Sequence, residues 1–333
     1  MKFAVINPEG RDPARLFPNG AGIPVDPGHP PINYHAYAAC MDGGFFRLEK
    51  EIPKSVSTVL VLLRRDLKCS LRVIQSLKAS GVRCLISWKE SGTHQIAEML
   101  DNSKRLGLFL EICAEADGFL SSTQSLIPLY QAAGCVKGNF LPTPYPVNQA
   151  EWNFARPANE RQGIFMGTRE FDVPSRNHLA ALLAACALAE RLGTHVTCIY
   201  RKKTDILDVL TKRYQNLRPQ KGPFPYVDYL AQMAAHRVVF QWDQSEVPGQ
   251  VAGDATLCRI PCVGGNSAIE ELVFPEFSGA ALSREQSLVT LEHLLTDEVF
   301  YTESCNRSEE LAQQLLSYES VSFALNTLIA QGI

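Results

Sequence analysis

Short apolar segments alternate with longer amphipathic segments along most of this 333-residue chain. In the first half, five apolar runs rich in β-branched or aromatic residues, and bounded by Gly, Pro or Ser, predict strands. They are KFAVINP, TVLVLLR, RCLISW, DGFLSS and VKGNFLP, at 2–8, 58–64, 83–88, 117–122 and 136–142. The segments near 33–41, 68–80, 93–114 and 123–133 predict helices. Strands that alternate with helices build parallel βαβ units, so the pattern predicts an α/β fold.

A stretch with four prolines, PTPYPVNQAEWNFARPANERQ at 142–162, interrupts this alternation and predicts an interdomain linker. Beyond it the alternation resumes. Strands are expected at 163–168, 194–200, 216–219, 237–242 and 260–265, and helices near 175–192, 225–235, 249–259 and from about 286 onward. We therefore predict two Rossmann-like, doubly wound α/β domains facing each other across a cleft. The N-terminal domain is expected at 1–145, the linker at 146–160 and the C-terminal domain at 161–333, with its last helices free to pack back toward the N-terminal domain.

Composition excludes several classes of protein. The net charge of −3 and pI near 6.2 argue against a general nucleic-acid binder, which usually carries a basic surplus. No apolar run approaches the roughly 18 residues of a membrane-spanning helix, and MKFAVINPEG lacks a secretory core. The ten cysteines include no CxxC pair, and they are expected to be free in a reducing compartment. We expect a cytoplasmic protein, with peripheral contact at the inner face of the membrane left open.

The segment SEVPGQVAGDATLCRIPCVGG at 245–265 carries two acids, Glu246 and Asp254, eight positions apart. It follows a predicted buried strand, and Gly249 or Gln250 is expected to start a helix. A helix N-terminus with a neighbouring glycine can bind phosphate, and Asp254 in the second turn leans back toward the loop. Backbone amides that bind a diphosphate, together with carboxylates that bind hydroxyl groups, would form a site for a nucleotide sugar. The alternative is a purely structural role, because an acid near a helix N-terminus is favourable by about 0.3–1 kcal/mol without any ligand.

These residues resemble the C-terminal signature of retaining glycosyltransferases of the GT-B fold, especially family four. The matching positions are Glu246, Gly249, Asp254, Ala255, Pro261 and Val263. The resemblance implies that the first acid contacts the donor sugar and that the loop amides bind sugar and diphosphate. It also implies that the second acid takes the ribose hydroxyls. Asp254 stands where the family has glutamate, so its side chain is one methylene shorter.

A second match opens the same half of the chain. GTREFDVPSR at 167–176 resembles the GR…K segment of the family, whose Arg and Lys grip the diphosphate. The resemblance assigns these roles to Arg169 and Arg176, the latter replacing the usual lysine. The alternative is that both are solvated loop charges. From the residues alone, Ser175 is expected to cap the following helix and Gly193 to end it.

The resemblance covers about 160–275 well and the first half weakly. In that half, Lys89 and His94 follow the predicted strand at 83–88, a suitable place to face the crevice, although a helix-capping or solvent-exposed role for His94 is left open. The chain has no G-x-S-x-G, H-E-x-x-H or P-loop motif, and no acidic DxD pair in a metal-binding context.

The sequence therefore predicts a metal-independent, hexosyltransferase-like enzyme that moves a sugar from a nucleotide diphosphate, by resemblance with retention. The catalytic candidates are Glu246, Arg169 and Arg176. The other donor-binding candidates are Gly167, Thr168, Ser245, Pro248, Gly249, Gln250 and Asp254. UDP and GDP donors are not distinguished, no further cofactor is expected, and the acceptor is a small molecule, glycan or lipid-linked molecule rather than nucleic acid. The alternatives are a nucleotide-sugar epimerase on the same fold and a non-catalytic GT-B protein that binds a nucleotide or a partner.

Overall fold

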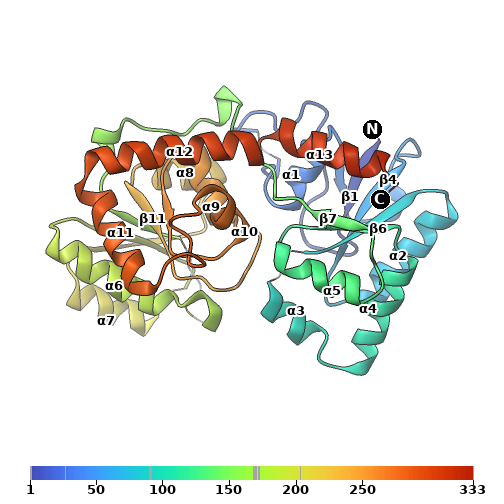
Figure 1. Cartoon of the computed structure of the whole chain (residues 1–333), viewed down its shortest axis with the longest axis horizontal. Coiled ribbons are helices and arrows are strands. Elements are labelled where there is room, and N and C mark those ends of the chain that lie inside the picture. Colours follow the sequence, from blue (N-terminus) through green and yellow to red (C-terminus); the bar gives the residue numbers. More distant parts are fainter. Residues whose placement is uncertain are drawn as a thin grey trace. The chain divides into compact units, whose positions relative to one another are not determined.

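The computed structural model describes residues 2–26, 28–89, 92–167, 171, 173–202 and 204–332. The chain divides into two compact units (Figure 1). Unit 1 comprises Met1–Pro146 and Leu316–Ile333, and unit 2 comprises Val147–Leu315. Within the described ranges, no helix has the length and apolar character needed to cross a membrane.

Unit 1 contains a seven-stranded sheet in the order β2-β3-β1-β4-β5-β6-β7. Its strands are β1 (Phe3–Ile6), β2 (Arg15–Leu16), β3 (Gly44–Phe46), β4 (Thr58–Leu63), β5 (Arg83–Trp88), β6 (Gly118–Ser121) and β7 (Gly138–Phe140). All neighbours pair in parallel except the short β2, which is antiparallel to β3. The strand order reverses between β1 and β4, the place where ligands bind in doubly wound folds.

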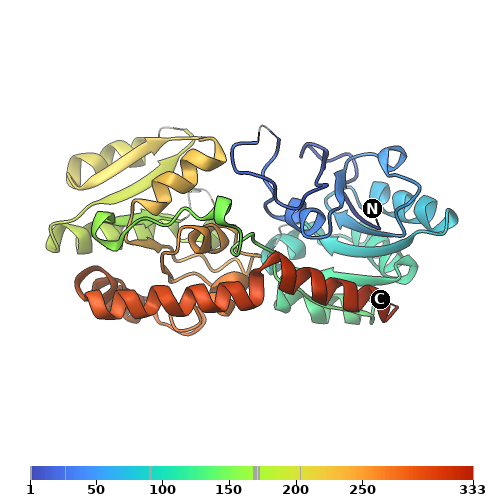
Figure 2. The same cartoon turned by 90° about the horizontal axis from the view of Figure 1, so that it is seen from above.

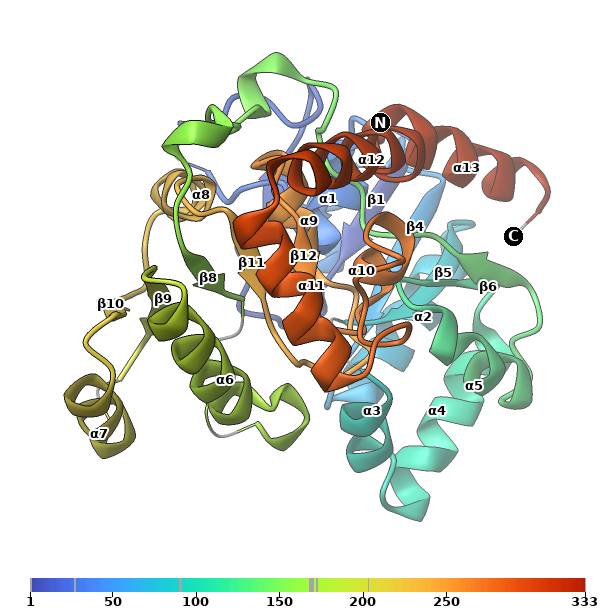
Figure 3. The same cartoon turned by 60° about the vertical axis from the view of Figure 1, so that its left-hand side comes forward.

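In the described residues of unit 1, the α-helices are α1 (Tyr34–Ala39), α2 (Leu67–Ala79), α3 (Thr93–Met99), α4 (Ser103–Glu115), α5 (Ile127–Ala132) and α13 (Tyr318–Ala330). Figures 1 and 3 show α1 and α13 over one face of the sheet, and α2, α4 and α5 over the other. The segment 93–114 was predicted as one helix, but it forms two. Asn102 accepts a hydrogen bond from the Arg105 amide at 3.0 Å, and this side-chain cap starts α4 as a separate helix.

Unit 2 contains a five-stranded sheet in the order β10-β9-β8-β11-β12, and every neighbouring pair is parallel. Its strands are β8 (Ile164–Met166), β9 (Val196–Tyr200), β10 (Leu217–Lys221), β11 (Val238–Phe240) and β12 (Cys262–Val263). Strands β8, β9, β11 and β12 are almost wholly buried, as their continuous hydrophobicity predicts, whereas the edge strand β10 is polar and largely not buried. The order reverses between β8 and β11, so the loops that leave these two strands emerge side by side.

The α-helices of unit 2 are α6 (His178–Arg191), α7 (Asp205–Arg213), α8 (Tyr226–Ala234), α9 (Gln250–Leu257), α10 (Ala268–Val273), α11 (Arg284–Thr296) and α12 (Glu298–Leu316). In Figure 3, α6 and α11 lie over one face of the sheet, and α8 and α9 over the other. Figure 2 shows α12, in orange-red, lying lengthwise along unit 2. Short 3-10 turns complete the chain at Glu49–Glu51, Gln124–Leu126, Ala150–Trp152, Ala158–Glu160 and Pro174–Arg176.

The segment predicted as a linker, 146–160, begins at the boundary between the two units and belongs from Val147 onward to unit 2. Trp152 is only 2% exposed, and the amide of Phe154 donates to the carbonyl of Leu257 at 2.9 Å, so this segment packs onto unit 2. The proline-rich composition indicated a break between domains, but it did not reveal the buried indole that holds the segment down.

The end of the chain returns to unit 1. The Tyr145 amide donates to the Leu316 carbonyl at 2.7 Å, and the hydroxyl of Tyr318 donates to the carbonyl of Pro31 at 3.5 Å.

All ten cysteines are free.

Candidate functional site

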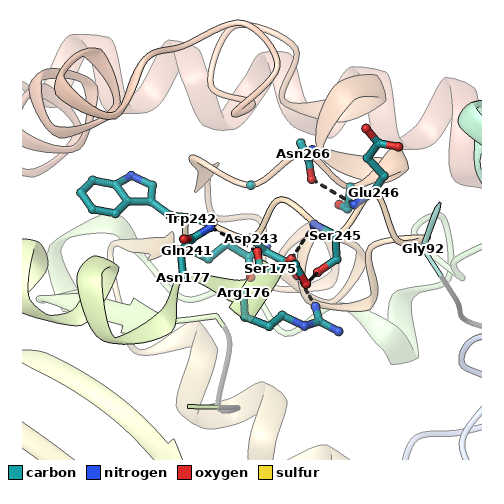
Figure 4. Close-up of polar contacts among 12 residues, drawn as sticks. Gly92, Ser175, Arg176, Asn177, Gln241, Trp242, Asp243, Ser245, Glu246 and Asn266 are labelled. Carbon is teal, nitrogen blue, oxygen red and sulfur yellow. Dashed lines mark hydrogen bonds and ion pairs between the residues drawn. The ribbon is translucent and has the colours of Figure 1, made fainter. Parts of the chain in front are cut away.

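The loops that follow β8 and β11 are joined by hydrogen bonds (Figure 4). The hydroxyls of Ser175 and Ser245 lie 2.7 Å apart, and the Gln244 amide donates to the Ser175 carbonyl at 2.8 Å. The Asn177 side-chain amide donates to the Trp242 carbonyl at 3.0 Å. The two loops that the sequence singled out separately therefore form one structure at the switch point of the sheet.

An ion pair adds to this junction. The guanidinium of Arg176 bonds to one carboxylate oxygen of Asp243, and the other oxygen accepts from the Ser245 amide at 2.9 Å. The Asp243 side chain is 4% exposed and that of Arg176 is 24% exposed. Arg176, predicted to bind a diphosphate, is thus already held by a buried acid that was not among the predicted site residues. Nothing in the local sequence QWDQS distinguishes Asp243 from an ordinary loop acid.

Ser175 does not cap the helix that follows. It lies in the 3-10 turn Pro174–Arg176, and the N-cap of α6 is Asn177, in the left-handed conformation with φ of 49°. Asparagine tolerates this conformation better than most residues, and the turn leaves the Ser175 hydroxyl free to meet Ser245. Gly193, with φ of 66°, follows the end of α6 as predicted.

Glu246 has an unusual backbone. Its φ of 50° places a non-glycine residue in the left-handed region, a conformation that costs roughly 1–2 kcal/mol. Its amide donates to the Asn266 side-chain oxygen at 3.2 Å, and its side chain points away from Arg176 (Figure 4). The next carbonyls, of Val247 and Pro248, accept from the first amides of α10 at 3.0 and 3.3 Å. The start of α10 therefore fixes the loop that carries Glu246.

The backbone conformation and close packing at position 249 require glycine. It caps α9 with φ of 101°, and a Cβ built on it would lie 2.3 Å from the Ser267 hydroxyl oxygen. The sequence interpretation attributed this glycine to close approach of a ligand. The structure shows that the space opened by the missing side chain is filled by the protein itself.

Asp254 is completely buried, with 0% of its surface exposed. The Tyr226 hydroxyl donates to its Oδ1 at 2.6 Å, and the Gln250 side-chain amide donates to its Oδ2 at 3.4 Å. Tyr226 and Gln250 are themselves half-buried. The carboxylate predicted to meet ribose hydroxyls therefore lies behind two polar side chains, of which Tyr226 was not predicted.

Glu270, also not predicted, organises the segment between β12 and α10. It is 0% exposed, and its carboxylate accepts from the Gln241 side-chain amide at 3.0 Å and from the amides of Gly265 and Ser267 at 3.1 and 3.0 Å. Burial raises the pKa of this carboxyl above 4.5. Ser267 and Glu270 form a capping box, so the S-x-x-E spacing in SAIE was a signal that could have found it.

His178 opens α6 as a buried imidazole. It is 2% exposed, and neither ring nitrogen has a hydrogen-bond partner in the part of the chain that the structure describes. Phe171 packs edge-on against it, with ring centroids 4.3 Å apart. Burial lowers the pKa of His178 from 6.5 to about 4, so the ring is neutral at pH 7.

Some predicted donor-binding residues cannot be placed. Thr168 and Arg169 lie outside the described residues. Gly167 is placed: its amide donates to the Phe240 carbonyl at 3.0 Å, and a Cβ there would lie 2.7 Å from the Gln241 side-chain oxygen. A larger residue at 167 would therefore collide with the end of β11.

The two tentative residues of unit 1 have different surroundings. The Lys89 ammonium lies 3.2 Å from a carboxylate oxygen of Asp12, which also accepts from the Asn7 side-chain amide at 2.6 Å. Burial opposes ionisation of Asp12, but Lys89 prevails and holds its pKa below 3.8. His94, near the start of α3, is exposed. Among the described residues no group of three or more His, Cys, Asp or Glu side chains could hold a metal ion.

Comparisons with known proteins establish the fold. No family model matches the chain, and no curated protein matches its sequence. The structure of Anabaena Alr3699/HepE in complex with UDP matches 99% of this chain and 100% of its own, with a TM-score of 0.68 at 11% identity. An α-glucosyltransferase in complex with UDP-glucose and abasic DNA matches 99% of each chain, with a TM-score of 0.62 at 10% identity. Trehalose-6-phosphate synthase OtsA matches 84% of this chain and 73% of its own, with a TM-score of 0.63 at 13% identity.

The chain therefore has the GT-B glycosyltransferase fold, built from two Rossmann-like units. The predicted fold class is confirmed.

Proposed function

We propose that this protein is a glycosyltransferase that moves a sugar from a nucleoside-diphosphate sugar to an acceptor. The observation that carries the proposal is the junction of the β8 and β11 loops, where Arg176, Ser175, Ser245 and Glu246 gather at the switch point of unit 2. Two proteins of the same fold support it, because one was solved with UDP and another with UDP-glucose.

The roles follow from the chemistry of a leaving diphosphate. As the glycosidic bond breaks, negative charge develops on the diphosphate, and a preorganised cation lowers the barrier by stabilising that charge. Arg176, fixed by Asp243 at the junction, is suited to this role, and we propose Arg169 as a second cation. We assign Glu246 to the donor sugar, because its left-handed backbone and the hydrogen bond from its amide to Asn266 fix the position of its backbone in the loop.

The finer features of the reaction extend the resemblance noted in the sequence. We propose transfer with retention of configuration, without a metal ion and with UDP or GDP as the nucleotide. A small molecule, glycan or lipid-linked molecule is the proposed acceptor. The net charge of −3 favours these classes over nucleic acid, although one structural neighbour was solved with DNA.

A thermal-shift panel of UDP, GDP, ADP, UDP-glucose and GDP-mannose tests the proposal. A nucleotide present at 100 times its Kd should stabilise the protein by about 2.7 kcal/mol. Arg176→Ala should weaken binding of the nucleotide at least tenfold. Arg213→Ala is the matched control, since Arg213 forms an exposed ion pair with Glu190 at 3.2 Å, and it should leave binding unchanged.

Binding alone does not prove transfer, so the second measurement is release of nucleoside diphosphate from the donor, with NMR of the sugar product. A new glycoside indicates transfer, whereas an epimerised sugar indicates the rival reaction. If no nucleotide in the panel stabilises the protein, the proposal is wrong.

A further inference from the structure

The loop between β12 and α10 forms a third part of the candidate site. Its residue Asn266 bonds to both ends of the turn 243–246, which follows β11. The Asn266 amide donates to the Asp243 carbonyl at 2.9 Å, and the Asn266 side-chain oxygen accepts from the Glu246 amide at 3.2 Å (Figure 4). Asn266 therefore spans the turn that carries both the ion-pair partner of Arg176 and the proposed sugar-binding acid.

Asn266 is itself held on both sides. The amides of its two neighbours, Gly265 and Ser267, donate to the carboxylate of the completely buried Glu270 at 3.1 and 3.0 Å. The Gly265 carbonyl accepts from the Gly279 amide at 2.6 Å. Because the residues that flank Asn266 are bonded to groups fixed within the fold, Asn266 transmits that rigidity to the turn after β11.

The left-handed backbone of Glu246 depends on this support. Its φ of 50° is set by the peptide group before it relative to the chain after it. The Asn266 oxygen fixes that peptide group, and the α10 amides that donate to the Val247 and Pro248 carbonyls fix the following chain. The cost of a left-handed non-glycine residue and the net contribution of one hydrogen bond are of the same order. Without the Asn266 oxygen, Glu246 should therefore relax toward negative φ, and its side chain should turn.

Resting on the proposed glycosyltransferase function, we infer that Asn266 is a positioning residue for sugar transfer: its side-chain oxygen holds the backbone of Glu246 so that the carboxylate meets the donor sugar. The backbone amide of Asn266 holds Asp243 in the same turn, and that contact does not depend on the side chain. A substitution at 266 should therefore impair the contact with the sugar and leave the proposed contact of Arg176 with the diphosphate intact.

The test measures kcat with the donor that the nucleotide panel selects, and Kd for the corresponding nucleoside diphosphate by isothermal titration. Asn266→Ala removes the oxygen and should lower kcat about tenfold, the effect of one hydrogen bond, while Kd stays within about twofold of wild type. Asn266→Asp keeps an oxygen for the Glu246 amide and should retain kcat within about threefold of wild type. Asn306→Ala, at an exposed position of α12, is the matched control and should change neither quantity.

The split between kcat and Kd separates positioning from structural damage. If Asn266→Ala disrupts the junction as a whole, Kd rises together with the fall in kcat, and the inference is wrong. An unchanged kcat in Asn266→Ala would also overturn it. If Asn266→Asp loses as much kcat as Asn266→Ala, the side-chain NH2 group contacts the substrate directly, and Asn266 is not a positioning residue.

A double-mutant cycle tests whether Asn266 acts through Glu246. Added to Glu246→Ala, Asn266→Ala should lower kcat by less than about twofold, because the carboxylate that it positions is already absent. Single-turnover measurements with excess enzyme follow the low rates of these variants. If the two losses multiply instead, Asn266 acts on another group and the inference fails.

Two further outcomes keep this inference distinct from the proposed function. If wild-type protein turns over a donor and Asn266→Ala does so at the same rate, the Asn266 assignment fails while the proposed function stands. If wild-type protein turns over no nucleoside-diphosphate sugar of the panel, both fail together.

Discussion

Arg176 and Asp243 join the two loops of the candidate site through an ion pair between a half-buried guanidinium and a buried carboxylate. The pair has two consequences that oppose each other. It fixes the Arg176 side chain in one place, which favours recognition of a phosphate. It also neutralises part of the charge that a diphosphate would meet, which weakens the attraction.

Replacing Asp243 with Asn should separate these two effects. Asn keeps an oxygen for the Ser245 amide but leaves Arg176 without its counter-charge, so unfolding free energy should fall by about 1–3 kcal/mol. Nucleoside-diphosphate affinity should stay the same or rise, because the guanidinium is no longer neutralised. Urea unfolding and isothermal titration measure the two quantities on the same sample. If stability and affinity are both lost, the fixed position of Arg176 matters more for binding than the removal of the Asp243 charge.

Replacing Glu246 with glycine should leave the stability of the protein almost unchanged but abolish its function. Its φ of 50° suits glycine, and relief of strain of about 1 kcal/mol is offset by the greater entropy of glycine in the unfolded chain. Glu246→Gly should therefore stay within about 1 kcal/mol of wild type, whereas Glu246→Val should lose about 1–2 kcal/mol because branched residues avoid this region. Donor turnover should be lost in both. Equal stability of the two variants, measured by chemical unfolding, would mean that the backbone is not strained.

Much of the fold could be predicted because its signals are local. Each predicted strand of the first half contains an observed one, and the apolar run at 237–242 contains β11. Helix α7 was missed and taken for a polar loop. The segment is short and largely charged, and only Leu207 and Leu210 of its apolar side chains are buried, although its amphipathic pattern and the Thr204 cap were visible in the sequence.

The candidate site was less predictable, because its contacts join residues that are distant in sequence. Asp254 and Tyr226 are 28 positions apart, and Arg176 and Asp243 are 67 apart. Spacing identified Asp254 as an acid near a helix start, but its burial depends on how α8 packs on α9. Glu270 differs, because the capping box that places it is contained within four consecutive residues.

Glu270→Gln should destabilise the protein in a pH-dependent way. The amide cannot accept from the Gln241 side chain, the Cys262 thiol and the two backbone amides together, so a buried mismatch of about 1–3 kcal/mol is expected near pH 5. The wild-type carboxyl has a pKa raised by burial, so its contribution to stability is fully present below 4.5 and is lost as pH rises through the raised value. The advantage of wild type over Glu270→Gln should therefore shrink between pH 5 and 8 in urea unfolding.

The exposed Glu276 provides the control for this experiment, because Glu276→Gln should show no comparable trend with pH. If the stability difference between wild type and Glu270→Gln grows as pH rises, ionised Glu270 is favoured by its donors more than it is penalised by burial.

His178→Leu should make the protein more stable and less sensitive to acid. At pH 7 leucine removes two buried ring nitrogens that lack hydrogen bonds among the described residues, a gain of about 1–3 kcal/mol. Because the pKa of His178 falls from 6.5 to about 4 on burial, the unfolded chain binds the extra proton between these values, and wild-type stability falls as pH drops. The difference should widen by about 2 kcal/mol at pH 5. His293→Gln, at an exposed position, should follow wild type at both pH values. A constant difference would mean that His178 finds a partner once protonated.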